Sequence, residues 1–450
     1  MEVISIRTAS LGDSTYIVID GEQAIVIDPQ RDIGRFLDII DDHAVQVTHV
    51  LETHMHNDYI SGGRDLAQRT GADLVLPAAS GATFAFVPAF NSELLDGEHG
   101  LVIKPIHTPG HTLAHTCYLV SKDNEPAAAF TGGSLLVGTA GRCDLLGEEL
   151  ARQLAVLQFG SLQRLGRLPD DTGVYPTHGE GSFCSSSGAA RSTSTIGAEK
   201  SDNPLYRFTD AEAFAEDQLD GLVPYPRYYQ RMGPINRRGP SASTVDQVSS
   251  LSPKALESHI ASGGSVLDGR DRSSYAAGHI PGSIGIEIGT SFAPWAGWLL
   301  DFDAPIALVL DDEQDAEDAA TELSRVGLDR IAGVMRGVEA WADSGRDLAA
   351  WDTASSAELA AALQENPAMQ ILDVRDPLEW KAGHIEGSMH TYVPDLVDGA
   401  PSGISADTAL WVICASGNRA SIAAGVLERH GLDLVVVTEG RVPDVVDSIK

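Results

Sequence analysis

The chain has 450 residues, of which 43% are hydrophobic, and a formal net charge of −33. This length predicts two to four domains, each with a core of its own. The acidic charge is spread along the chain, which argues against binding to nucleic acid or to an anionic membrane because phosphates would be repelled.

Two further features predict where the protein resides. There is no apolar run of 18 residues, and residues 1–5 lack a basic segment, so neither a membrane span nor a signal peptide is indicated. The four cysteines lie in unrelated contexts, which argues against a disulfide framework. We therefore expect a cytoplasmic protein.

The first chemically informative segment is residues 54–58, with the sequence His-Met-His-Asn-Asp. The apolar run at 47–51 predicts a buried strand, which places this segment on the following loop. Two imidazoles at i and i+2 and a nearby carboxylate cannot share one helix face, but in an extended loop they can reach a common centre. Neutral imidazole with carboxylate suits zinc or non-haem iron.

Two more histidine motifs follow predicted strands further along the chain. Residues 107–112 read His-Thr-Pro-Gly-His-Thr, and residues 175–179 read Tyr-Pro-Thr-His-Gly. Glycine and proline mark both as turns, where a rigid sheet presents side chains to one point. With the strand and turn at 25–29, these motifs resemble the metallo-β-lactamase fold, an αββα sandwich, over about residues 1–200.

The resemblance implies metal ligands at five positions: His54, His56 and His111 in a first site, and Asp58 and His178 in a second. The family motif ends in a histidine where this chain has Tyr59, and it has an aspartate where this chain has Gly133. A two-metal centre is therefore not expected. The expectation is one metal ion held by three imidazoles, Fe(II) or else zinc; the alternative is a family member that has lost its metal.

Residues 141–144, Gly-Arg-Cys-Asp, resemble a Gly-Arg-Thr-Asp segment of the persulfide dioxygenases in this superfamily. That resemblance implies that Arg142 holds an anionic substrate, whereas the alternative is a surface loop with an internal Arg–Asp pair. His107 and His115 either orient a ligand or substrate or are ordinary polar residues at a turn.

The second half of the chain contains an internal duplication. Residues 266–271 match 371–376, and residues 278–283 match 383–388, both at an offset of 105 residues. This spacing is domain-sized, and apolar strands alternate with helical stretches, which predicts parallel α/β sheets. The Asp-x-Arg and Gly-His-Ile-x-Gly-Ser segments resemble rhodanese domains.

The second copy continues into residues 414–419, Cys-Ala-Ser-Gly-Asn-Arg, which resemble the CxxGxR loop of sulfurtransferases. A short loop between a buried strand and a helix start turns backbone N–H groups inward, so Cys414 becomes a nucleophilic thiolate that can carry sulfane sulfur. Gly417 permits the tight curvature, and Arg419 pins the loop and adds positive charge. The alternative for Cys414 is a buried, inert thiol.

The matching stretch of the first copy, residues 310–318, is acidic and has no cysteine, so sulfur transfer is not expected there. We therefore predict three domains: a metallo-β-lactamase-like domain with a connecting arm (1–240), a pseudo-rhodanese (245–350) and a catalytic rhodanese (355–450).

The whole chain resembles fusion proteins in which a persulfide dioxygenase-type domain precedes these two rhodanese copies. The resemblance implies that a low-molecular-weight thiol persulfide is oxidised at mononuclear iron to sulfite, while Cys414 moves sulfane sulfur so that sulfite leaves as thiosulfate. The expected partners are these small molecules and further copies of the chain in a homo-oligomer, with no nucleic acid and no membrane. Two alternatives remain: a thioester hydrolase of the hydroxyacylglutathione hydrolase type, and a metal-deficient N-terminal binding module beside an active rhodanese.

Overall fold

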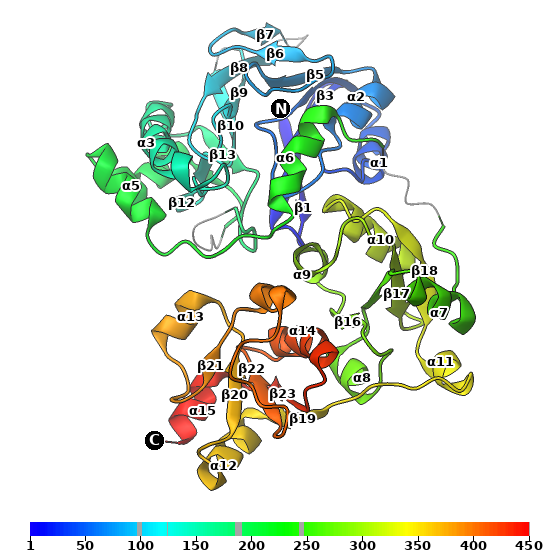
Figure 1. The fold of residues 1–450 in the computed structure, drawn as a ribbon. Coiled ribbons are helices and arrows are strands. Elements are labelled where there is room, and N and C mark those ends of the chain that lie inside the picture. Colours follow the sequence, from blue (N-terminus) through cyan, green and yellow to red (C-terminus); the bar gives the residue numbers. More distant parts are fainter. Residues whose placement is uncertain (97–100, 124, 185–190, 243–246, 450) are drawn as a thin grey trace. The chain divides into compact units, whose positions relative to one another are not determined.

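The computed structural model describes residues 1–96, 101–123, 125–184, 191–242 and 247–449. The chain divides into two compact units, Met1–Thr244 with Ser324–Gly327 and Val245–Leu323 with Leu328–Lys450 (Figure 1). Among the described residues, no helix is both long enough and apolar enough to cross a bilayer.

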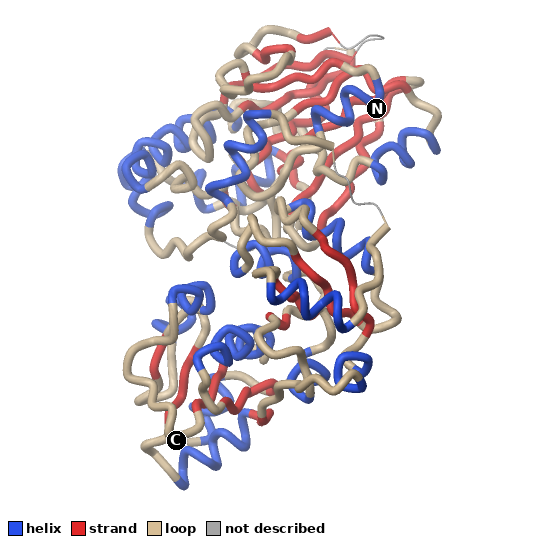
Figure 2. Tube along the Cα trace, turned by 45° about the vertical axis from the view of Figure 1, so that its right-hand side comes forward, coloured by secondary structure: helices blue, strands red, loops and turns tan. Residues whose placement is uncertain are grey.

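The first unit contains two six-stranded sheets whose strands lie between helices (Figure 2). The first sheet has the order β1 (Glu2–Thr8), β2 (Asp13–Asp20), β3 (Gln23–Ile27), β4 (Gln46–Leu51), β5 (Asp73–Pro77), β6 (Val87–Ala89). The second has the order β14 (Ser194–Thr195), β13 (Gly173–Pro176), β10 (Glu125–Gly132), β9 (Thr116–Lys122), β8 (Leu101–His107), β7 (Leu95–Asp96). A small hairpin, β11 (Leu135–Leu136) with β12 (Thr139–Ala140), follows β10.

Alternating apolar residues bury both faces of these sheets. Tyr16 and Val18 of β2 belong to a core shared with Tyr118 and Phe130 of the second sheet, so the two sheets pack face to face. The outer face of the first sheet packs on α1 (Gly34–Asp42) and α2 (Gly63–Thr70), and that of the second on α3 (Glu148–Leu165) and α5 (Ala211–Leu219). Among the described residues, this unit also contains the helices α4 (Ile196–Asp202), η2 (Pro204–Arg207) and α6 (Tyr229–Arg238). This is the predicted αββα sandwich.

The second unit contains two parallel sheets, as the alternation of strands and helices predicts. The first sheet has the order β16 (Ile284–Gly285), β15 (Ser265–Asp268), β17 (Ile306–Leu310), β18 (Ile331–Arg336), with α7 (Pro253–Ala261), α8 (Arg272–Ala277), α9 (Phe292–Leu299), α10 (Ala316–Arg325) and α11 (Glu339–Asp343). The second has the order β19 (Asp352–Ser355), β23 (Leu434–Glu439), β22 (Leu410–Ile413), β20 (Gln370–Asp373), β21 (Met389–His390), with α12 (Ser356–Glu365), α13 (Pro377–Ala382), η3 (Val393–Asp398), α14 (Asn418–Leu427), η4 (Glu428–His430) and α15 (Val442–Ser448).

The duplicated Asp-x-Arg motifs form the same structure in both copies. Arg270 pairs with Asp268 at 2.7 Å, and Arg375 pairs with Asp373 at 2.6 Å. Each arginine also donates to a glycine carbonyl eight residues further on. Each pair is buried, so the arginine neutralises a carboxylate at the end of a strand and fastens the following loop.

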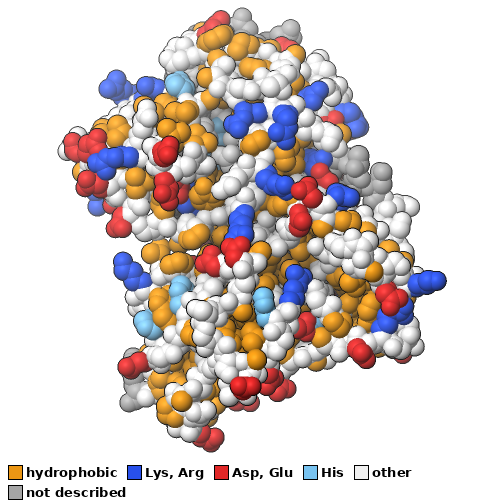
Figure 3. Space-filling view, in the orientation of Figure 1, with side chains coloured by type: hydrophobic (Ala, Val, Ile, Leu, Met, Phe, Trp, Pro, Cys, Tyr) orange, Lys and Arg blue, Asp and Glu red, His pale blue; other side chains and the backbone are white. Residues whose placement is uncertain are grey.

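Acidic and basic side chains lie interspersed with apolar ones on the face of the molecule that Figure 3 shows. The net charge of −33 is therefore not gathered into one acidic patch on that face.

Candidate functional site

The loops that follow β4, β8 and β13 bring together the five candidate ligands, four histidines and one aspartate. All five side chains, His54, His56, Asp58, His111 and His178, are at most 1% exposed. The rings of His54, His111 and His178 lie 4.8 to 5.4 Å apart between centroids.

Three of these histidines each have one ring nitrogen bonded and the other unpartnered. Nδ1 lies 2.9 Å from the Thr53 hydroxyl in His54, 2.9 Å from the Arg142 carbonyl in His111 and 2.8 Å from Asp13 in His178. Among the described residues, their Nε2 atoms have no hydrogen-bond partner. Buried polar atoms without partners are rare and costly, and the ligand atoms of this trio lie within 4.8 Å of one another. The trio therefore fits a metal ion.

His56 is bonded differently from the other three. Its Nε2 lies 3.0 Å from Glu52, 3.2 Å from Asp28 and 3.0 Å from the phenol of Tyr59. Within the part of the chain that the structure describes, its Nδ1 has no hydrogen bond, and this atom lies 3.9 Å from Asp58.

The structure thus groups the candidate ligands differently from the expected assignment. His178, rather than His56, completes the trio with His54 and His111. His56 belongs to two other sets, one with Asp58 and His178 and one with Asp28 and Glu52. Because His178 belongs to both of the sets that consist wholly of predicted ligands, these two sets compete for one imidazole.

Burial and neighbouring charges shift the pKa values of the three histidines in different directions. Burial, together with the neighbouring imidazoles, lowers the pKa of His54 far below its usual value and that of His111 to about 3. Burial also opposes the charge of His178, but the carboxylates of Asp58 and Asp13 outweigh it and raise the pKa to about 10. Burial thus favours the neutral form of His54 and His111, whose lone pairs are available to a cation, whereas metal binding at His178 competes with protonation.

Three buried carboxylates that contact this cluster were not among the predicted site residues: Asp28, Asp13 and the Glu52 that contacts His56. Asp28 accepts hydrogen bonds from the backbone and hydroxyl of Thr53, both at 2.7 Å, and from the hydroxyl of Thr177. It therefore joins the loops after β3, β4 and β13. Asp13 orients His178 from the start of β2. Asp28 follows an apolar strand and precedes proline, which was a usable signal, but nothing local marks Asp13.

The glycine at the position of the missing carboxylate is in close contact with a ligand. A methyl group added at Gly133 would lie 2.6 Å from Nε2 and 2.7 Å from Cγ of His111, so the imidazole fills the space of the absent side chain. The Gly133 N–H donates to Nε2 of His115, whose Nδ1 meets the Thr108 hydroxyl. Both nitrogens of His115 are thus bonded, and it supports the turn under His111. His107 lies outside the trio and contacts the Leu113 carbonyl.

Arg142 has an internal role, which corrects the expectation that its side chain holds a substrate. The guanidinium is 2% exposed and pairs with Asp144 through two bonds of 2.7 Å. It also donates to the carbonyls of Phe183 and Val223 and stacks on Tyr225. The Arg142–Asp144 pair matches the alternative of an internal Arg–Asp pair, except that Arg142 is buried and not on a surface loop. The part of Arg142 that serves the cluster is its backbone carbonyl, which holds His111.

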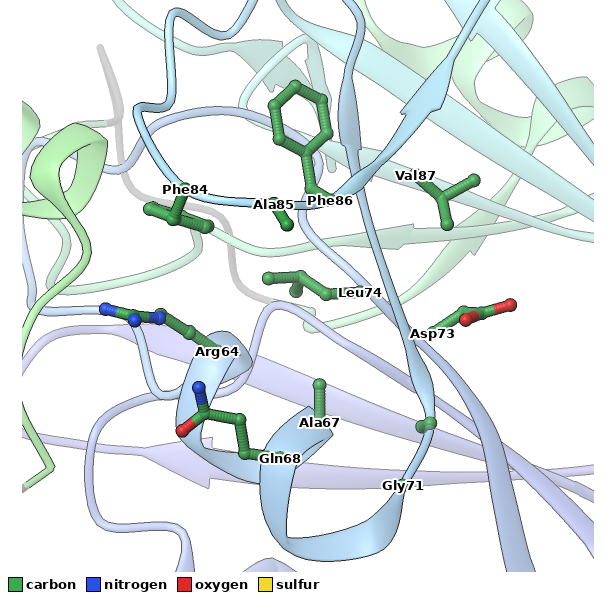
Figure 4. A pocket seen from close by; sticks show the side chains of 11 residues that line it. Arg64, Ala67, Gln68, Gly71, Asp73, Leu74, Phe84, Ala85, Phe86 and Val87 are labelled. Carbon is green, nitrogen blue, oxygen red and sulfur yellow. The ribbon is translucent and has the colours of Figure 1, made fainter.

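The connecting arm closes over the cluster from one side. Asn236 of α6 donates to the carbonyls of His56 and Tyr59 and accepts from the Ser61 N–H. A cavity of about 530 Å³ lies elsewhere, between α2 and the segment before β6, and none of the candidate ligands lines it (Figure 4).

The Cys414 loop directs backbone N–H groups toward the thiol. It follows β22 and leads into α14, and the thiol accepts the N–H groups of Gly417 at 3.1 Å and Ser416 at 3.5 Å. Gly417 has φ +83°, a left-handed conformation that favours glycine. The cysteine is buried, while Ser416 above it is exposed, so the sulfur lies just beneath a small surface loop.

Arg419 is held in place by acids of the preceding segment. Its Nη2 lies 3.0 Å from Glu379, and Asp376 lies 3.7 Å from its Nη1. Burial opposes ionisation, but the hydrogen bonds from Arg419 lower the pKa of Glu379 to about 2. These ion pairs connect Arg419, at the start of α14, to Asp376 and Glu379 of the α13 segment.

Family models match most of the chain. The metallo-beta-lactamase superfamily matches residues 8–178, and the rhodanese-like domain matches residues 252–344 and 355–444. The second rhodanese match includes Cys414, and the first includes the copy without a cysteine at that position.

Solved structures and curated proteins are similar to parts of the chain. A metallo-beta-lactamase from Staphylococcus aureus subsp. aureus COL is 26% identical with a TM-score of 0.68, over 75% of this chain and 99% of that one. ETHE1 from Myxococcus xanthus is 30% identical with a TM-score of 0.46, over 53% of this chain and 98% of that one. Hydroxyacylglutathione hydrolase from Rhizobium meliloti (strain 1021) is 28% identical over 40% of this chain and 65% of its own length. The chain spans about half to two thirds of the length of the curated relatives it matches.

Proposed function

The chain belongs to the proteins that join a metallo-beta-lactamase domain to two rhodanese-like domains, and on this basis we propose that it is a two-centre enzyme of sulfur metabolism. Its N-terminal centre oxidises a low-molecular-weight thiol persulfide at one metal ion, and its C-terminal centre transfers sulfane sulfur through Cys414. The observation that carries the proposal is the cradle around Cys414, in which two backbone N–H groups meet the thiol at the start of a helix.

Sulfur transfer follows from the chemistry of that cradle. The N–H groups of Ser416 and Gly417 stabilise a thiolate, which attacks the outer sulfur of a persulfide R–S–SH. The S–S bond breaks, the thiol R–SH leaves with the electron pair and a proton, and Cys414 holds the transferred sulfur. Sulfite then attacks that sulfur and leaves as thiosulfate, which restores the thiolate.

The residues of the N-terminal domain fit a metal ion through His54, His111 and His178. When bound, an iron(II) ion supplies redox chemistry with dioxygen and open positions for substrate, and zinc would supply Lewis acidity instead. The chain's own contribution is to keep His54 and His111 neutral by burial, to orient His178 through Asp13, and to exclude water with Asn236 and α6. Joining both centres in one chain raises the effective concentration of a reactive intermediate at the second centre.

Two variants test the two halves independently. His178→Ala should lower bound metal and abolish oxygen uptake with glutathione persulfide, yet leave thiosulfate:cyanide sulfurtransfer intact. Cys414→Ser should abolish thiosulfate:cyanide sulfurtransfer, yet leave bound metal and oxygen uptake intact. Absence of oxygen uptake by metal-replete wild type would refute the oxidation step, and unchanged sulfurtransfer by Cys414→Ser would refute the role of that cysteine.

A second candidate function is thioester hydrolysis at the N-terminal centre. It is favoured by the likeness to a hydroxyacylglutathione hydrolase and by the additional set His56, Asp58 and His178. Shared use of His178 argues against filling both sets at once. Two metal equivalents per chain together with hydrolysis of S-lactoylglutathione would select this function.

The proposed partners are the thiol persulfide, sulfite and thiosulfate, with other copies of the chain in a homo-oligomer. The oligomeric state can be measured by light scattering.

A further inference from the structure

We propose that the first rhodanese-like copy, which has no cysteine at the matching position, positions the catalytic loop of the second copy through Arg272. The inference rests on the proposed sulfur transfer by Cys414 and assigns Arg272 as a positioning residue, since its side chain contacts the loop and not the sulfur.

Arg272 contacts the peptide unit that faces the sulfur. Its Nη1 donates a hydrogen bond of 2.7 Å to the carbonyl of Ser416. The same peptide unit contains the N–H of Gly417, which donates to the Cys414 thiol at 3.1 Å. Because a peptide unit is planar and trans, its carbonyl and N–H point in opposite directions, so fixing the carbonyl aims the N–H at the sulfur. The positive guanidinium also polarises the peptide and strengthens that N–H as a donor.

Arg272 is itself held rigidly. Its Nε and Nη2 donate to the same Glu287 oxygen, at 2.9 and 2.7 Å, which leaves Nη1 directed at the loop. Both side chains are about one third exposed or less. The first copy makes a second contact with the loop, in which the side-chain Nδ2 of Asn418 donates to Ser291 Oγ at 3.3 Å.

The duplication shows that this arginine is specific to the first copy. Arg272 is the first residue of α8, directly after its N-cap Asp271. The matching position of the second copy, at the offset of 105 residues, is Pro377, which begins α13 after its N-cap Asp376. Proline is the usual choice at such a position because the N–H has no helical partner. The first copy has instead a long cationic side chain, Arg272, that reaches the Cys414 loop of the second copy.

The test compares two arginines that make the same kind of contact between the copies. Arg272→Ala removes the bond to Ser416, whereas Arg429→Ala removes a guanidinium–carbonyl bond of 2.8 Å to Gly282 that does not involve the loop. The full-length protein is assayed for thiosulfate:cyanide sulfurtransfer and for hydrogen exchange of the peptide that spans residues 410–420.

We expect Arg272→Ala to lower kcat about tenfold with a smaller change in KM, and to speed exchange at Ser416 and Gly417. Arg272→Lys should recover part of kcat because one cationic donor remains, and Glu287→Gln should cause a smaller loss in the same direction. Arg429→Ala should match wild type in both assays.

Equal effects of the two alanine variants, or wild-type kcat and exchange in Arg272→Ala, would overturn the proposal. If wild type has no sulfurtransferase activity, the proposed function fails and hydrogen exchange alone decides the positioning role. In that case faster loop exchange in Arg272→Ala but not in Arg429→Ala supports the role, and unchanged exchange refutes it.

Discussion

The substitution Gly133→Ala tests the metal centre most directly, because a single methyl group would enter the space that the His111 ring occupies. The new Cβ would lie 2.6 and 2.7 Å from Nε2 and Cγ of that ring. Non-bonded heavy atoms prefer about 3.5 to 4.0 Å, so the imidazole must move by about 1 Å. It has little room to do so, because the ring is buried and its Nδ1 is held 2.9 Å from the Arg142 carbonyl.

This displacement should be visible in two quantities. Overpacking of a buried site should lower the free energy of unfolding of the metal-free protein by about 1 to 3 kcal/mol. Moving one of three ligand nitrogens should also weaken metal binding, by about 10- to 100-fold if the effect resembles loss of a supporting contact. Gly133→Asp restores the carboxylate of the family motif, but its side chain would enter the same space as the His111 ring. It should therefore also weaken metal binding by the trio.

Urea unfolding in the presence of a chelator measures the first quantity, and metal content after equilibrium dialysis measures the second. Gly160→Ala is the matched control, since this glycine lies within α3 and a Cβ there has no neighbour within 4 Å. The control should stabilise the protein by up to about 1 kcal/mol through helix propensity and leave metal binding unchanged. Wild-type metal affinity together with wild-type stability in Gly133→Ala would refute the placement of His111 over this glycine.

Three further predictions follow from other contacts. Asp13→Asn should weaken metal binding about 10- to 100-fold without changing sulfurtransfer, because the carboxylate orients His178, and equal affinity in dialysis would contradict this. Gly417→Ala should lower sulfurtransferase activity and the free energy of unfolding. The φ of +83° alone should cost about 1 to 2 kcal/mol, and the added Cβ would also lie 2.7 Å from the backbone of β23. Urea unfolding measures the loss of stability. The Glu379–Arg419 pair should stabilise the fold above pH 4.5 and lose its contribution as the pH falls toward 2, because the folded pKa of Glu379 lies below the unfolded one. The difference in unfolding free energy between wild type and Glu379→Gln should therefore be constant from pH 7 to 5 and shrink below that, and a difference that grows on acidification would be inconsistent with the pair.

The sequence alone determined the features that depend on neighbouring residues. Strand periodicity followed by glycine and proline placed the histidine motifs on loops at strand ends, and the repeat at 105 residues predicted two similar parallel sheets. The cradle of Cys414 was predictable for the same reason, since the sulfur and its N–H donors lie within four residues of one another.

Only the tertiary structure decided how distant groups combine. It paired His178 with His54 and His111, turned His56 toward Asp28, and fastened Arg142 to the carbonyls of Phe183 and Val223. It also brought Arg272 of one copy to the loop of the other. These outcomes depend on the distances and directions between strand ends that are far apart in sequence, and no local pattern of residues encodes them, because each side chain has several possible partners until packing leaves room for one.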